Sequence, residues 1–423
     1  MTSESETPRE AYVWIWLPGK AEPVVAGRIE ADGANYSFNY GRSYLDRKCA
    51  IPIYLPELPL QRGAIAPLPP LKLAGCLRDG SPDAWGRRVI INWLTSRKRE
   101  LVREIEFDEL TYLLQSGSDR TGNLDFQVSA TRYESREALN ATLEELQSSA
   151  ERVLAGEPLN REIDRALHHG SSIGGARPKA LIEDGGAKYI AKFSSSGDTF
   201  SVVKAEFAAM RLAALAGLKV APVKLTQASD KEVLLIMRFD REKSGGKWTR
   251  RGMVSALTIF GLDELMARHA SYEDLAETVR ARFTDPRHTL RELFARMTFN
   301  ILVGNSDDHA RNHAAFWDGE YLTLTPAYDI CPQVRSGREA TQAMLIHGDT
   351  RWSQLSECLR GANAFLIDEE EALDIMRGQI ACIRKNWDEV SAEAKLSTAD
   401  KALLWGRQFL NPFAFEGLEG RLA

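Results

Sequence analysis

The most informative part of the sequence is Asn305-Ser-Asp-Asp-His-Ala-Arg-Asn312, which Tyr328-Asp329 follows a short distance downstream. Asp307 stands five positions before Asn312, and Asp329 supplies a second carboxylate. This order suits the transfer of a phosphate group, in which one Asp orients the acceptor hydroxyl and later Asn and Asp oxygens hold Mg²⁺. Because an isolated Asp-x₄-Asn occurs often by chance, the interpretation depends on what lies upstream.

A glycine-rich segment lies upstream, at residues 170–179. The backbone N–H groups of Gly174 and Gly175 can approach phosphate oxygens closely because glycine has no Cβ atom. Ala176 and Lys179 belong to the same predicted phosphate contact. The segment has neither the Walker A pattern nor Gly-x-Gly-x-x-Gly, so a mobile surface turn is the alternative.

A lysine follows in the middle of an apolar strand. Lys192 sits in Lys188-Tyr-Ile-Ala-Lys-Phe193, where a charge is expensive unless it is paired. Kinases use such a lysine to contact the α- and β-phosphates and pair it with a Glu on the next helix, which makes Glu206 the natural partner. The alternative is an edge-strand lysine that points to solvent.

Met237-Arg238-Phe239 ends an apolar run that predicts a buried strand. The backbone of Met237 and Phe239 could bind the edge of an adenine ring. The alternative is a plain core strand with Arg238 exposed.

Residue patterns predict strands in the first part of the chain and mainly helices in the last part. β-Branched and aromatic residues predict strands at 12–17, 24–29, 188–193 and 233–239. Apolar spacing predicts helices at about 84–102, 107–114, 135–154, 200–215, 290–301, 366–390 and 399–408, with a hairpin over 314–324.

We therefore expect an α+β protein with a protein-kinase-like two-lobed fold and an extra N-terminal β-rich domain. The β-rich N-lobe and the mainly helical C-lobe would meet at the Asp307 segment. The predicted divisions are an N-terminal domain at 8–130, a kinase N-lobe at 150–250 and a helical C-lobe at 251–423.

Composition narrows the class of protein. The chain has 423 residues, 44% of them hydrophobic and 27% charged, which is ordinary for a globular protein with two or three domains. A net charge of −5 argues against a wholly basic, polyanion-binding surface. Five scattered cysteines, a polar start without an apolar signal core and the lack of a membrane-spanning run predict a cytoplasmic protein with reduced thiols.

These motifs, taken together and in order, resemble the HipA-type serine/threonine kinases, which are toxins of bacterial toxin–antitoxin pairs. The specific marks are Ser172-Ile-Gly-Gly-Ala-Arg-Pro-Lys179, Asp307-Asp-His-Ala-Arg-Asn312 and Leu324-Thr-Pro-Ala-Tyr-Asp329. Gly117-Ser-Asp-Arg-Thr-Gly-Asn123 resembles the glycine-rich segment that closes the family's first domain. The resemblance covers nearly the whole chain.

The resemblance implies a role for each marked residue. Asp307 would be the catalytic base and Lys192 the ATP-phosphate contact. The remaining implied residues are Asn312 and Asp329 as Mg²⁺ ligands, Gly174, Gly175, Ala176, Lys179, Met237, Phe239 and His309 as ATP-binding residues, and Ser172 or its neighbour Ser171 as the autophosphorylation site. Modification of that serine would displace the glycine-rich segment and stop the kinase.

The resemblance also implies partners. A helix-turn-helix antitoxin of the HipB type would bind the chain, and operator DNA would be contacted indirectly through that antitoxin. The protein substrate would be an aminoacyl-tRNA synthetase or a similar translation protein, with growth arrest and persistence as the result.

Three other functions remain open from the residues alone. A small-molecule kinase would use the same Asp-x₄-Asn arrangement, and a co-repressor could keep the fold without catalysis. His309 and His313, spaced i,i+4 beside Asp307 and Asp308, could instead form a metal site for hydrolysis. The metal site is disfavoured because the Glu of His-Glu-x-x-His is missing and a strand is expected to begin near His313.

Overall fold

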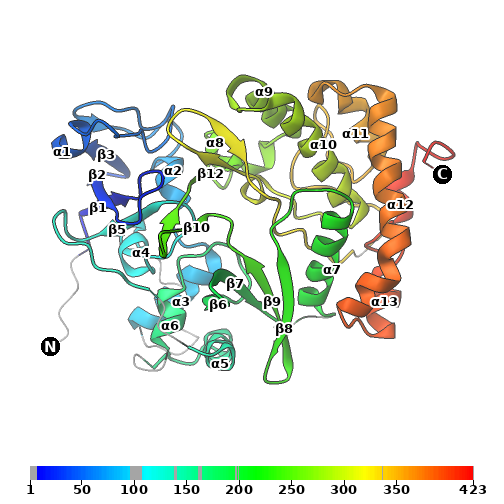
Figure 1. Ribbon diagram of the computed structural model, residues 1–423, viewed down its shortest axis with the longest axis horizontal. Helices are drawn as coiled ribbons and strands as arrows, with labels where there is room; N and C mark the ends of the chain where they lie inside the picture. The colour runs from blue at the N-terminus through cyan, green and yellow to red at the C-terminus, as the bar shows by residue number, and fades with distance from the viewer. Residues whose placement is uncertain are drawn as a thin grey trace.

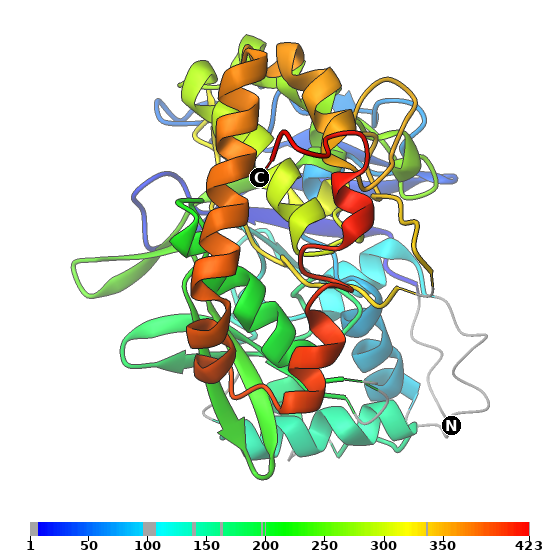
Figure 2. The same ribbon diagram turned by 90° about the vertical axis from the view of Figure 1, so that its right-hand side faces the viewer.

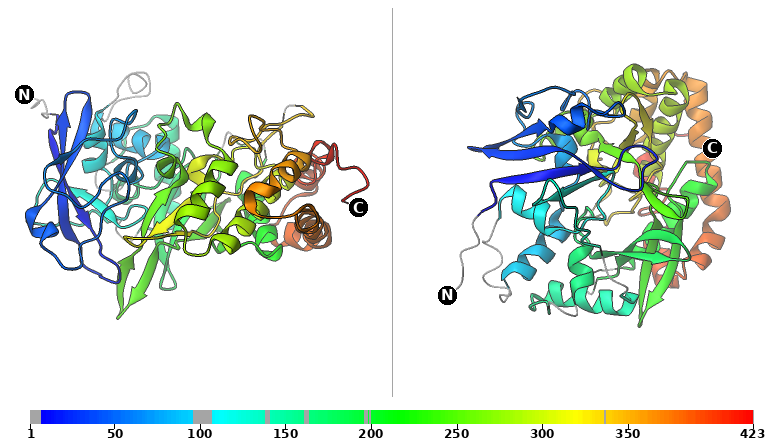
Figure 3. Two further views of the ribbon diagram at one scale, coloured as in Figure 1. Left: turned by 90° about the horizontal axis from the view of Figure 1, so that it is seen from above. Right: turned by 60° about the vertical axis from the view of Figure 1, so that its left-hand side comes forward.

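The computed structural model describes residues 7–95, 107–137, 141–160, 164–195, 198, 200–335 and 337–422. The N-terminal strands and the C-terminal helices lie at opposite ends of the long axis (Figure 1). The view from above shows the same separation (Figure 3). Within the described ranges, no helix has both the length and the apolar character needed to cross a bilayer.

The N-terminal part (residues 7–137) contains a five-stranded antiparallel sheet in the order β4-β3-β2-β1-β5. Its strands are β1 (Glu10–Ile15), β2 (Val24–Asp32), β3 (Asn35–Tyr40), β4 (Ala64–Ile65) and β5 (Leu124–Gln127). The accompanying helices are α1 (Arg42–Leu45), α2 (Gly75–Arg78), α3 (Ala84–Thr95) and α4 (Glu109–Gln115). The predicted continuation of α3 to residue 102 lies outside the described residues.

A second antiparallel sheet has the order β6-β7-β9-β8. Its strands are β6 (Lys179–Asp184), β7 (Ala187–Phe193), β8 (Val223–Ala228) and β9 (Lys231–Met237). Both faces are covered, because Leu234 and Ile236 pack on one side with α7 (Val202–Leu215), and Val233 and Leu235 pack on the other with α3 and α5 (Leu143–Ala155). This burial explains the continuous apolar run that predicted the strand.

Helix α5 begins later than the sequence predicted. Residues 135–137 are not helical, and the helix starts after Thr142, whose side chain forms a capping box with Glu145. The prediction of a helix from residue 135 was therefore wrong, because the Glu-rich periodicity extended past the capping signal. A short helix, α6 (Arg165–His169), then leads into residue 170.

The C-terminal part is mainly helical, as predicted. A hairpin pairs β10 (Arg241–Ser244) with β11 (Lys247–Arg250), and a three-stranded sheet joins β12 (Gly252–Ser255), β13 (Ala314–Trp317) and β14 (Leu322–Leu324). The helices are α8 (Ala256–Ile259), α9 (Tyr272–Arg282), α10 (Pro286–Leu302), α11 (Leu355–Gly361), α12 (Glu369–Glu393) and α13 (Thr398–Leu404). Figure 2 shows α12 running along the outer face of this helical part.

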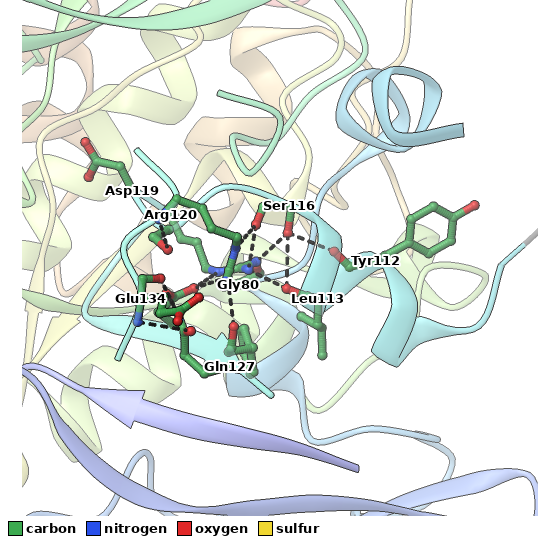
Figure 4. Close-up of polar contacts among 12 residues, drawn as sticks. Gly80, Tyr112, Leu113, Ser116, Asp119, Arg120, Gln127 and Glu134 are labelled. Carbon is green, nitrogen blue, oxygen red and sulfur yellow. Dashed lines mark hydrogen bonds and ion pairs between the residues drawn. The ribbon is translucent and has the colours of Figure 1, made fainter. Parts of the chain in front are cut away.

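One buried arginine, Arg120, links several segments of the N-terminal part through hydrogen bonds. The guanidinium of Arg120 is fully buried, with Nε 2.8 Å from Asp125 Oδ1 and Nη1 2.8 Å from the carbonyl oxygen of Gly80. Further donors reach Ser116 and the carbonyl of Leu113 (Figure 4). These hydrogen bonds hold the guanidinium of Arg120 in one place, and they therefore fix the backbone between α4 and Asp119.

Asp119 then connects the N-terminal part to the end of β9. Its carboxylate lies 3.1 Å from Arg238 Nη1, 2.9 Å from Arg241 Nη2 and 2.6 Å from Lys188 Nζ. Asp240 balances the same two arginines and accepts the N–H of Gly122 at 2.8 Å. The alternative of a plain core strand with Arg238 exposed is wrong about this arginine, because its side chain is only 1% exposed in this cluster.

We expect Asp119→Asn to lower the free energy of unfolding at pH 7 by about 3 kcal/mol, since two arginines stay buried with one carboxylate. Burial by itself would raise the pKa of Asp119, but Arg238, Arg241 and Lys188 hold it well below its ordinary value. The carboxylate therefore stabilises the fold above about pH 4, and this contribution is lost as the pH falls further.

Denaturant titrations at pH 7 and below pH 4 measure this effect, with Asp374→Asn as the matched control. The side chain of Asp374 is 68% exposed on α12, so its substitution should change stability by less than about 0.5 kcal/mol. A difference between wild type and Asp119→Asn that does not narrow at low pH would contradict the assignment.

Candidate active site

A cavity of about 380 Å³ lies where the second sheet, the C-terminal part and the N-terminal part meet. Two loops border it, the glycine-rich loop (residues 170–179) and the Asp307 loop (residues 305–312). The structure brings to this cavity all of the residues predicted for ATP, metal or catalysis: Gly174, Gly175, Ala176, Lys179, Lys192, Met237, Phe239, Asp307, His309, Asn312 and Asp329. Their individual roles stay predictions.

Lys192 is the charged centre of the cavity wall. Strand β7 carries it between β6 and β9, so it is not on an edge strand as the alternative supposed. Its Nζ lies 2.6 Å from Glu206 Oε1 on α7 and 2.5 Å from Asp329 Oδ1. The predicted pairing of Lys192 with Glu206 is confirmed.

Lys192, Glu206 and Asp329 shift one another's pKa values. Burial would lower the pKa of Lys192, yet the two carboxylates raise it above its ordinary value. Burial likewise opposes the ionised form of Asp329, but Lys192 and Lys179 outweigh it and lower the pKa of Asp329 to about 2. Asp329 therefore stays a carboxylate, and its φ of 59° places it in the left-handed region that turns the carboxylate toward Lys192.

The Asp307 loop is placed by helix α10. The helix ends at Leu302, and Gly304 turns the chain at a φ of 70°, where a Cβ atom would come within 2.8 Å of the carbonyl oxygen of Gln408. Asn312 Nδ2 donates to the carbonyl of Asp307 at 3.1 Å, which closes the loop on itself. Asp307 is an exposed residue at the edge of the cavity, and partial burial raises its pKa, although the nearby His309 opposes this shift.

The two histidines of the alternative metal site point to different places. His309 lines the cavity, whereas His313 is buried with Nε2 at 2.9 Å from Asp308 Oδ1 and 3.2 Å from the hydroxyl of Tyr272. Asp308 also accepts the Tyr272 hydroxyl. The two histidines therefore do not share one site, because Asp308 pairs with His313 behind the loop while His309 lines the cavity.

The glycine-rich loop is closed over Lys179. Gly175 has a φ of 102°, and the ammonium of Lys179 donates to the carbonyl of Gly174. Burial, with the neighbouring Lys192, lowers the pKa of Lys179 to about 8. In the part of the chain that the structure describes, the N–H groups of Gly174, Ala176 and Arg177 have no protein acceptor, so they are available to an anion.

Ser171 and Ser172 do not line the cavity. They are 1% and 3% exposed, and among the described residues neither hydroxyl has a hydrogen-bond partner. Buried hydroxyls without partners are unusual. The closed loop therefore withholds both predicted autophosphorylation sites from solvent.

The N-terminal part contributes a wall that the sequence analysis missed. Asp79 and Asp83 line the cavity beside Thr121 and Asn123. Arg311 joins this wall to the Asp307 loop, with Nη1 3.8 Å from both Asp79 Oδ1 and Asp83 Oδ1. The residues Asp79-Gly-Ser-Pro-Asp83 indicate only the start of a helix, so the sequence did not predict that these two carboxylates line the cavity.

Comparison with known families finds matches in both halves of the chain. The family described as HipA N-terminal domain matches residues 15–127, and the family described as HipA-like C-terminal domain matches residues 171–387. A solved structure of the Shewanella oneidensis toxin–antitoxin system, HipA with HipB and operator DNA, has a TM-score of 0.65 and 18% identity. It covers 96% of this chain and 99% of that chain, which confirms the predicted α+β two-lobed fold.

Two curated proteins are similar over shorter stretches. The serine/threonine-protein kinase toxin HipA of Shewanella oneidensis is 25% identical over 183 residues, which is 38% of this chain and 42% of that protein. Y4mE of Sinorhizobium fredii, named as a candidate kinase, is 28% identical over 130 residues, which is 30% of this chain and 31% of that protein. The matched region thus spans less than half the length of either relative.

We expect Lys192→Met to destabilise the protein by about 3 kcal/mol at pH 7, because the buried carboxylate of Glu206 is left without its cation and close to the partly exposed carboxylate of Asp329. The loss of stability relative to wild type should be smaller at pH 5, because protonation of one carboxylate there removes the unpaired charge. Thermal and denaturant unfolding at both pH values measure this difference in stability. The double variant Lys192→Met/Glu206→Gln should recover part of the lost stability, because it also removes one of the two carboxylate charges. A single variant as stable as wild type at pH 7 would show that Lys192 does not neutralise this site.

Proposed function

The chain belongs to the HipA family, and on this premise we propose that it is an ATP- and Mg²⁺-dependent protein serine/threonine kinase, the toxin of a toxin–antitoxin pair. The observation that carries the proposal is a cavity in which Lys192 is bound to both Glu206 and Asp329, beside Asp307 and Asn312. Its volume of about 380 Å³ is in the range of a small-ligand site.

The proposed mechanism consists mainly of positioning. The adenine ring would lie against Met237 and Phe239, and the phosphates would lie under Gly174, Gly175 and Ala176, whose loop presents free N–H groups. Lys179 and Lys192 supply positive charge at the same wall.

At the other side of the cavity, Asp307 would orient the acceptor hydroxyl and receive its proton as the hydroxyl oxygen bonds to the γ-phosphorus. The bond from that phosphorus to the bridging oxygen would break, and ADP would leave. Asn312 and Asp329 offer oxygen atoms of the kind Mg²⁺ prefers, and Asp329 stays ionised because its pKa is about 2. Bound Mg²⁺ would neutralise charge on the transferring phosphate. His309, beside Asp307, would brace this loop.

We further propose that the kinase modifies itself on Ser172 or Ser171. Since both hydroxyls are buried behind the closed glycine-rich loop, the reaction requires the loop to swing outward first. The phosphorylated loop could not return to a pocket that leaves even a neutral hydroxyl unpaired. This would make the modification an off-switch.

The proposed partners follow from the relatives. A HipB-like helix-turn-helix antitoxin would bind the chain, and operator DNA would be reached through it. The substrate would be an aminoacyl-tRNA synthetase or a similar translation protein.

Asp307→Asn should reduce phosphate transfer by at least about 100-fold, because the hydroxyl loses its proton acceptor while ATP binding is kept. Incubation with Mg²⁺ and γ-labelled ATP, with and without purified synthetases, measures transfer, and mass spectrometry maps the label. Asp374→Asn serves as a folded control with normal activity.

Label on Ser171, Ser172 or a synthetase in wild type alone supports the proposal. Transfer only to small molecules would replace it with a small-molecule kinase. The absence of ATP binding would favour a non-catalytic co-repressor.

ATP affinity should fall as the pH rises from 7 to 9, because Lys179 loses its proton near its pKa of about 8. Bound phosphate favours the ammonium form, so the loss is at most about tenfold for each pH unit above 8. Titration calorimetry at pH 7, 8 and 9 measures the affinity. Lys179→Arg keeps its charge over this range and should show a flat profile, whereas a flat profile in wild type would exclude Lys179 from phosphate binding.

A further inference from the structure

The start of helix α3, far from the glycine-rich loop in sequence, holds that loop at three points. Asp83 Oδ2 accepts the N–H of Gly175 at 2.7 Å, and the backbone N–H of Trp85 donates to the carbonyl of Gly175 at 3.1 Å. The indole Nε1 of Trp85 donates to the carbonyl of Lys179 at 3.0 Å. Both peptide groups of Gly175 and the loop's last residue are therefore bound by the N-terminal part.

The helix and the loop approach each other closely at two glycines. A Cβ atom on Gly86 would lie 2.0 Å from the carbonyl oxygen of Ser171, so the two segments pack backbone against backbone there. A Cβ atom on Gly174 would lie 2.6 Å from the side-chain oxygen Oδ2 of Asp83. Trp85, 1% exposed, fills the space beneath them.

The side chain of Asp83 binds the glycine-rich loop instead of capping its own helix. It immediately precedes α3, and its carbonyl accepts the N–H of Arg87 at 2.8 Å, as expected of an N-cap residue. At other helices of this chain, Asp108, Asp285 and Asp368 in that position accept an N–H of their own helix through the side chain. The carboxylate of Asp83 turns instead to Gly175.

The same carboxylate faces the opposite wall of the cavity. Asp83 Oδ1 lies 3.8 Å from Arg311 Nη1, four residues after Asp307. The side chain of Asp83 therefore contacts both the glycine-rich loop and the Asp307 loop. Arg311 offsets its charge, so an incoming phosphate does not meet an isolated carboxylate.

We infer that Asp83 and Trp85 are positioning residues of the phosphate site, so that the N-terminal part completes the site instead of only adjoining it. This inference rests on the proposed function. With Gly175 held from both sides, the N–H groups of Gly174, Ala176 and Arg177, which have no acceptor among the described residues, are already arranged before a nucleotide arrives, and binding orders less of the chain.

Calorimetric binding of ATP and of adenosine to the full-length protein tests the inference. Asp83→Ala should weaken ATP binding about tenfold, which is typical for a lost hydrogen bond to a charged group, and should leave adenosine within about twofold. Asp83→Asn keeps an acceptor for Gly175 and should restore ATP affinity to within about threefold of wild type. Asp374→Ala, on the exposed face of α12, is the matched control.

Trp85→Phe supplies an independent variant, because it removes the indole N–H and keeps a large ring. It should also weaken ATP binding and spare adenosine. Equal losses for both ligands would reduce Asp83 and Trp85 to general structural residues, and unchanged or tighter ATP binding by Asp83→Ala would overturn the inference.

Hydrogen exchange of residues 171–179 without nucleotide separates this inference from the proposed function. Asp83→Ala should speed exchange in this loop by about tenfold and leave β9 unchanged. If wild type bound no ATP, the proposed function would fail. The exchange measurement would still test whether Asp83 holds the glycine-rich loop in place. Unchanged exchange in the variant would overturn the inference even in an active kinase.

Discussion

One buried ammonium group sets the geometry of the cavity. Lys192 on β7 is shared by Glu206 on α7 and by Asp329, which comes 137 residues later in the chain. A buried lysine is costly unless it is paired, and the buried carboxylate of Glu206 and the partly exposed carboxylate of Asp329 repel each other unless a cation lies between them. Each of the three groups is stable only when the other two are in place. The sheet, its covering helix and the segment after β14 are therefore held in one arrangement.

A second constraint joins the N-terminal part to this arrangement. Asp119 and Asp240 neutralise Arg238 and Arg241 where β9 leaves the cavity, and Asp83 meets the glycine-rich loop and Arg311 at the other side. Both contacts are polar and directional, so they fix distances in a way that apolar packing alone would not. The N-terminal part is thus tied to the cavity at the end of β9 and at the glycine-rich loop.

The sequence predicted the parts of the site that carry local signals. The spacing of Asp307 and Asn312 lies within one loop, and Lys192 interrupts an apolar strand just before the helix that bears Glu206. Arg238 was misjudged because its partner Asp119 is 119 residues away, and residue type alone favours exposure for arginine. Asp83 was overlooked for the same reason, since Gly175 is 92 residues distant and no local pattern connects the two.

The position of Ser171 and Ser172 links these constraints to conformational change. The same closed loop that presents free N–H groups to the cavity buries both hydroxyls without partners. A serine modified with two negative charges needs several hydrogen bonds or solvent, and the closed state offers neither. The contacts of Gly175 with Asp83 and Trp85 therefore oppose the exposure of these serines, because the loop must break them before either hydroxyl can reach the surface. Under the proposed autophosphorylation, closure of the site and modification of the loop would exclude each other on steric and electrostatic grounds.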